Sequence, residues 1–134
     1  MTKTRAIPAI LAVLVLLGGA WLTPSAEGSA PHLTLLSSSP AADTVVVASP
    51  DTIRLHFSEP PRIRGTTVRL TDAANELVAS TGAAANAEDA KEVFIRPDRP
   101  LAPGAYTVHW RVIAQDGHTQ RGEFSFQVGG TAAR

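Results

Sequence analysis

Two alternating apolar–polar runs joined by the turn Asp116-Gly117-His118 constrain the fold of this chain most strongly. The first run extends from Tyr106 to Ile113, and the second from Gly122 to Val128. A period of two residues is typical of half-buried strands, and Asp-Gly is a strong hairpin turn dipeptide. The sequence therefore predicts a β-hairpin whose apolar face, which carries most of the aromatic residues, forms the centre of the core.

The rest of the chain after residue 30 consists of short strand-like runs separated by Pro, Gly, Asp and Asn. Apolar and polar residues alternate at 53–58 and 67–71, and shorter apolar runs occur at 33–39, 45–47, 77–78 and 93–95. The alanine-rich segment from Ala83 to Ala90 could hold a helical turn, but a loop fits it better. About seven short strands in roughly 100 residues predict an all-β chain, folded as one antiparallel β-sandwich.

The first thirty residues have the pattern of a secretory signal peptide. Lys3 and Arg5 precede an uninterrupted apolar run from Ala9 to Leu17, and small residues typical of processing sites follow. The run is shorter than the ~20 residues that span a bilayer, so we interpret residues 1–30 as cleaved rather than as a membrane anchor. Cleavage is expected between residues 26 and 31. Gly28-Ser29-Ala30 fits the small-residue rule, although Pro31 would then follow the cut.

Composition limits the ligands and partners of this chain. Lys and Arg together number 12, and so do Asp and Glu, so the balance of charge predicts neither nucleic acid nor an anionic membrane as a partner. There is no Cys, and Met1 is the single Met, which excludes thiolate and thioether ligands after the leader is removed. Any bound metal would need imidazole and carboxylate groups, which suit borderline metals such as copper(II).

Asp116 and His118 could form half of such a metal site, since residues two apart in an extended or turn backbone can point the same way. Turn chemistry with a solvated histidine explains the tripeptide about equally well. His32 is the candidate for the other half, although alone it fits a frayed terminal segment better. If His32 were the first residue, its α-amine and ring Nδ1 would chelate one metal. His56 and His109 fall on the polar phase of their strands, which favours surface imidazoles over ligands.

Three blocks of the sequence resemble the CopC family of periplasmic copper-resistance proteins. They are the start at His32 to Ala42, the strand Ile53 to Pro60 that ends Phe-Ser-Glu-Pro, and Tyr106 to Val128 with its Asp-Gly-His turn. The resemblance implies an Ig-like, cupredoxin-like sandwich, residues 31–128, before a disordered tail at 129–134. It also implies that the protein is not an enzyme.

The resemblance implies one copper(II) per chain, held by His32, Asp116 and His118. No Met-rich copper(I) site is expected, because no Met follows Met1. The protein would be a monomer located in the periplasm, or extracellular if the host lacks an outer membrane. It would sequester copper or pass it to an inner-membrane copper transporter or another periplasmic copper protein. Pro31 departs from the family pattern, which has a small residue before the ligand histidine, and an unremoved Pro31 would abolish the amine chelate.

Two other functions remain open from sequence. An N-terminal histidine chelate also holds copper in polysaccharide monooxygenases, but those enzymes carry an aromatic substrate face, whereas the few aromatic residues here are expected in the core. A metal-free Ig-like interaction module could use the same scaffold.

Overall fold

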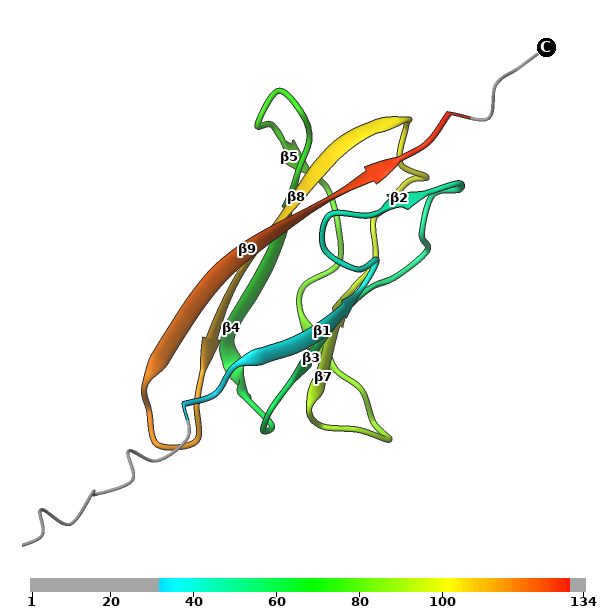
Figure 1. Ribbon diagram of the computed structural model, residues 1–134. Helices are drawn as coiled ribbons and strands as arrows, with labels where there is room; N and C mark the ends of the chain where they lie inside the picture. Colours follow the sequence, from blue (N-terminus) through cyan, green and yellow to red (C-terminus); the bar gives the residue numbers. More distant parts are fainter. Residues whose placement is uncertain (1–31, 131–134) are drawn as a thin grey trace, which may run out of the picture.

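The chain forms two packed β-sheets in the computed structural model, which describes residues 32–130 (Figure 1). The four-stranded sheet has the order β1-β3-β7-β6, with strands Leu35–Ser39, Ile53–Phe57, Glu92–Ile95 and Ala84–Ala85. The five-stranded sheet has the order β2-β9-β8-β4-β5, with strands Val45–Val46, Thr119–Val128, Gly104–Ile113, Arg62–Thr71 and Leu77–Val78. Residues 32–130 contain no helix, hence none that could cross a membrane. The predicted β-sandwich is confirmed.

The predicted hairpin is the longest paired unit of the fold. β8 and β9 pair in antiparallel register from Gly104 opposite Val128 to Ile113 opposite Thr119. The second strand therefore begins three residues earlier than its apolar alternation indicated. The first three residues of β9, Thr119-Gln120-Arg121, are all polar and gave no hydrophobic signal, but the backbone ladder continues down to the turn.

One hydrophobic core lies between the sheets. The inward positions of the strands are buried, and they alternate with exposed or half-buried ones as predicted. Phe57 and Trp110 meet edge to face across the core, with ring centroids 5.4 Å apart, and Tyr106 stacks on Phe126 at 5.8 Å. Trp110 is half-buried at the margin, while the other three belong to the buried core. Such aromatic pairs stabilise the core beyond the area they bury.

Two short elements differ from the sequence prediction. β2 pairs in parallel with β9, a local departure from the antiparallel pairing that the sequence predicted for the sandwich. β6 lies in the alanine-rich segment that was interpreted as loop, and it pairs with β7. Each element has two residues, which is too short for a period to be recognised. The expected leader, 1–30, lies outside the described residues, as do residues 131–134 of the expected tail, but Gly129 of that tail donates a backbone hydrogen bond to Val46 at 2.7 Å.

An irregularity in β4 brings its first residue to the end of the hairpin. Arg62 pairs with Ile113 and Thr67 with Arg111, so extra residues of β4 bulge out between these two pairs. Gly65 in the bulge has φ +91°, a conformation that favours glycine, and its carbonyl accepts a hydrogen bond from the guanidinium of Arg111 at 3.0 Å. The bulge thereby places Arg62 beside the loop that follows β8.

Candidate metal centre

The turn between β8 and β9 presents Asp116 and His118 to solvent. The backbone N–H of Ala114 donates to the carbonyl of His118 at 2.8 Å, and that of Gly117 donates back to Ala114 at 2.9 Å. Gly117 has φ +92°, which the Asp-Gly pair of the sequence anticipated. Ala114 is buried and anchors the turn, while the three residues from Asp116 to His118 are exposed.

Both carboxylate oxygens of Asp116 contact His118. Oδ1 accepts the backbone N–H of His118 at 2.9 Å, and Oδ2 lies 2.8 Å from the ring Nδ1. The side-chain hydrogen bond from His118 is the main cause that lowers the pKa of Asp116, and the same bond raises the pKa of His118. The side chains are 57% and 69% exposed, so the pair is a surface pair. Within residues 32–130 no hydrogen bond engages the Nε2 of the His118 imidazole, so this nitrogen is available to a ligand.

His32 lies beside this turn. Its ring centroid is 6.4 Å from that of His118, with the rings nearly perpendicular at 85°, and its charge contributes to the lowered pKa of Asp116. Figure 1 shows the chain entering β1 next to the β8–β9 turn. The next residue, Leu33, is 2% exposed in the core. A buried side chain therefore holds His32 in place at the start of the described chain.

His32 and the Asp116–His118 pair lie close together, but they are not yet arranged to bind one ion. Two imidazoles on one metal, each with its nitrogen about 2 Å from the ion, have ring centroids roughly 4.5 Å apart when cis and roughly 6.3 Å apart when trans. The observed 6.4 Å is only slightly larger than the trans value. Within residues 32–130, no three His, Cys, Asp or Glu side chains already have the spacing of a metal site. A rotation of the exposed His32 or His118 would be needed for both to ligate one ion.

The connection between β3 and β4, residues 58–61, also borders the centre. Ser58 Oγ accepts the backbone N–H of Thr34 at 3.0 Å, and the backbone N–H of Ser58 donates to the Thr34 carbonyl at 2.9 Å. The side-chain amide of Gln115 donates to the Pro60 carbonyl at 3.0 Å, and Arg62 donates to the Gln115 carbonyl. Sequence reasoning missed Ser58, Gln115 and Arg62, because no local pattern shows that these residues meet across the fold.

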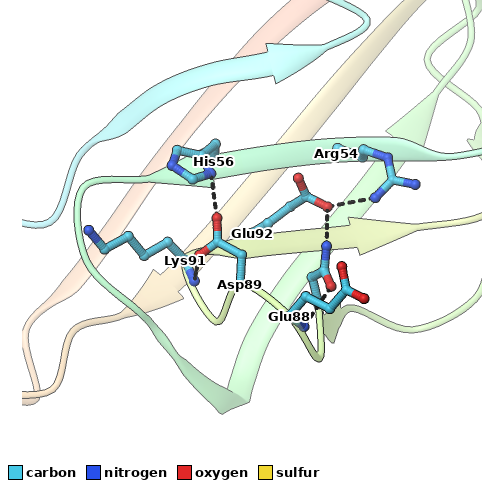
Figure 2. Close-up of polar contacts among 7 residues, drawn as sticks. Arg54, His56, Glu88, Asp89, Lys91 and Glu92 are labelled. Carbon is cyan, nitrogen blue, oxygen red and sulfur yellow. Dashed lines mark hydrogen bonds and ion pairs between the residues drawn. The ribbon is translucent and has the colours of Figure 1, made fainter.

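His56 lies on the outer face of the four-stranded sheet, among other partners. Its Nδ1 faces Asp89 at 3.4 Å, beside the Arg54–Glu92 ion pair at 2.6 Å (Figure 2). Glu92 also accepts a hydrogen bond from Asn86 at 3.0 Å. These contacts are all among residues 54–92, and none of them connects His56 to the β8–β9 turn.

His109 lies on the outer face of the five-stranded sheet. Its Nδ1 is 3.0 Å from Glu123, and its Nε2 is 3.1 Å from the hydroxyl of Thr71. Both ring nitrogens already have partners, so His109 offers no free nitrogen to a metal in this arrangement.

Comparison with known proteins gives a consistent result. The CopC domain matches residues 35–129. Protein YobA of Escherichia coli K12 is 36% identical over 115 residues, covering 86% of this chain and 90% of YobA. Copper resistance protein C of Xanthomonas campestris pv. juglandis is 36% identical over 102 residues, covering 72% of this chain and 80% of that protein. The crystal structure of CopC from Methylosinus trichosporium OB3b superposes with a TM-score of 0.71 at 30% identity, over 77% of this chain and 99% of that one.

Proposed function

This chain belongs to the CopC domain family, and on that basis we propose that it is an exported protein that binds one copper(II) ion. His32 and His118 supply nitrogen ligands, and Asp116 supplies an oxygen. The relatives named copper resistance protein C support a role in copper resistance or homeostasis. The protein sequesters copper or delivers it to a partner, such as an inner-membrane copper transporter or another periplasmic copper protein.

The observation that carries this proposal is the approach of His32 to the Asp116–His118 pair. The ring centroids of the two histidines lie 6.4 Å apart, although His32 is near the start of the domain sequence and His118 is near its end. Imidazole and carboxylate together suit copper(II), and neither soft ligand type is available in residues 32–130. All three side chains are exposed, so an ion can enter without opening the core.

The N-terminus decides how many nitrogens His32 contributes. A mature chain that begins at His32 supplies the α-amine and the ring, whereas one that begins at Pro31 supplies the ring of His32 without that amine chelate. We therefore expect tighter binding from the shorter form. Mass spectrometry of the protein from its exporting host identifies the form that occurs, and copper titration of both forms compares their affinities.

Copper(II) titration of the mature protein with and without His118→Ala tests the site. One equivalent is expected to bind, with nitrogen couplings in the EPR spectrum and a sharp loss of affinity in the variant. His109→Ala is the matched control, because that histidine lies outside the centre with both nitrogens engaged. Equal affinity of His118→Ala and wild type would refute the assignment.

A further inference from the structure

The connection between β3 and β4 touches both halves of the proposed copper site. On one side, Ser58 exchanges two hydrogen bonds with Thr34, at 3.0 and 2.9 Å. Thr34 is two residues after His32, and the buried Leu33 lies between them. The position of His32 is thus set by a buried side chain and by a bonded pair at Ser58.

On the other side, the same connection holds the turn. Gln115 directly precedes Asp116, and its side chain donates to the Pro60 carbonyl at 3.0 Å. The guanidinium of Arg62 donates to the backbone carbonyl of Gln115. Gln115 is therefore held through both its side chain and its backbone, immediately before the first proposed ligand of the turn.

The connection itself is stiff. It follows Phe57, which is fully buried, and it contains consecutive prolines, Pro60 and Pro61, the second of which is buried. Each proline ring restricts φ to a narrow range, so the connection has little freedom to bend. Chain ends and exposed turns are otherwise among the most mobile parts of a domain.

We propose that Ser58, Gln115 and Arg62 are positioning residues that hold His32 and the Asp116–His118 turn at a fixed separation across the β3–β4 connection. This inference rests on the proposed function, since it assigns a role in copper binding to residues that do not ligate. Preorganised ligands lose less freedom on binding than mobile ones. The connection therefore raises copper affinity without touching the ion.

Ser58→Ala removes the hydroxyl that holds Thr34 and leaves the backbone bond intact. We expect copper(II) affinity to fall roughly three- to tenfold, the equivalent of one net hydrogen bond, and Ser58→Thr to restore it. Ser49→Ala is the matched control. The Ser49 hydroxyl accepts the backbone N–H of Leu101 at 2.7 Å. Ser49 precedes β3 in the chain, whereas Ser58 follows it, so Ser49→Ala should lose a similar hydrogen bond and keep the wild-type copper affinity.

Gln115→Ala frees the turn from Pro60, and we expect a comparable loss of affinity. Gln127→Ala, at an exposed position near the far end of β9, should leave binding unchanged. The EPR spectrum of bound copper adds a measurement that a change in protein stability alone would not alter. Looser ligands should broaden the copper hyperfine lines of Ser58→Ala and Gln115→Ala, while Ser49→Ala and Gln127→Ala keep the wild-type spectrum.

Amide hydrogen exchange on the copper-free protein separates the two proposals. Ser58→Ala should speed exchange at Thr34, and Gln115→Ala should speed it at Ala114 and Gly117, whose N–H groups close the turn. If the wild type binds no copper, the proposed function fails, while the exchange data still test the connection. The inference would be overturned if Ser58→Ala and Gln115→Ala both kept the copper affinity, the EPR spectrum and the amide exchange of the wild type. It would also be overturned if Ser49→Ala lost as much copper affinity as Ser58→Ala.

Discussion

Replacing Gly122 with alanine is expected to destabilise the fold, because this glycine lies against Trp110. The two residues face each other across the β8–β9 ladder. A Cβ on Gly122 would lie 2.4 Å from Cζ2 and 2.7 Å from Cε2 of the indole. Carbon atoms in favourable contact are about 3.5–4.0 Å apart, so the indole would have to move by about 1 Å.

The indole has little room for that movement. It meets the fully buried ring of Phe57 at a centroid distance of 5.4 Å. Overpacking of this kind costs about 1–3 kcal/mol, while alanine reduces the entropy of the unfolded chain and returns about 0.4–1 kcal/mol. The middle of each range gives a net loss of about 1.3 kcal/mol, which lowers the melting temperature of a domain this size by about 5–10 °C.

Thermal unfolding followed by circular dichroism measures the loss. Gly82→Ala is the control, because a Cβ at Gly82 meets no atom within 4 Å, and its stability should stay within about 0.5 kcal/mol of wild type. If Gly122→Ala melts within about 2 °C of wild type, the indole has room that the structure does not show, and the packing argument is wrong.

Three further variants test the polar groups. NMR titration of the copper-free protein should show a raised pKa for His118 that Asp116→Asn lowers. The contact between Asp116 and His118 therefore stabilises the folded state at pH values between the ordinary pKa of aspartate and that of histidine. This stabilisation is lost as the pH rises through the raised pKa of His118. It is also lost as the pH falls through the lowered pKa of Asp116. Copper needs neutral imidazole, so its binding should weaken as pH falls through that raised pKa, which a titration across this range checks. His56→Ala should leave copper affinity unchanged in calorimetry, and a clear loss would place His56 in the site. The pKa of Glu92 is lowered, chiefly by the hydrogen bond from Asn86. Glu92→Gln should therefore have a lower melting temperature than wild type near neutral pH, and the difference should shrink in acid. A difference in melting temperature that does not change with pH would contradict this.

The strands could be predicted where alternation is long enough to show a period. Tyr106 to Ile113 is an example, because every second side chain there is apolar and turned to the core. Two residues carry no period, so β6 could not be found this way, and β2 was indicated only by the short apolar run at 45–47. The parallel pairing of β2 with β9 depends on where the chain lies after β1, which is a property of the assembled sandwich.

The sequence likewise indicated the placement of some proposed ligands, while the tertiary structure decided that of others. Asp116 and His118 are two residues apart on an Asp-Gly turn, so the sequence alone indicated that they could point the same way, and the structure adds the 2.8 Å contact between their side chains. The proximity of His32 could only be suggested by resemblance to a family, because nothing local connects it to the turn. β1 and β8 belong to different sheets, so the packing of the two sheets decided that proximity, by bringing the start of β1 beside the β8–β9 turn.

Tertiary structure alone decided the contacts of Ser58, Gln115 and Arg62. Their hydrogen bonds join residues 24, 53 and 55 positions apart, and the β4 bulge that brings Arg62 to Gln115 is invisible in a pattern of period two. Sequence patterns report which face a residue occupies, since that follows from local backbone geometry. Which distant segments share an end of the fold depends on how the whole chain packs.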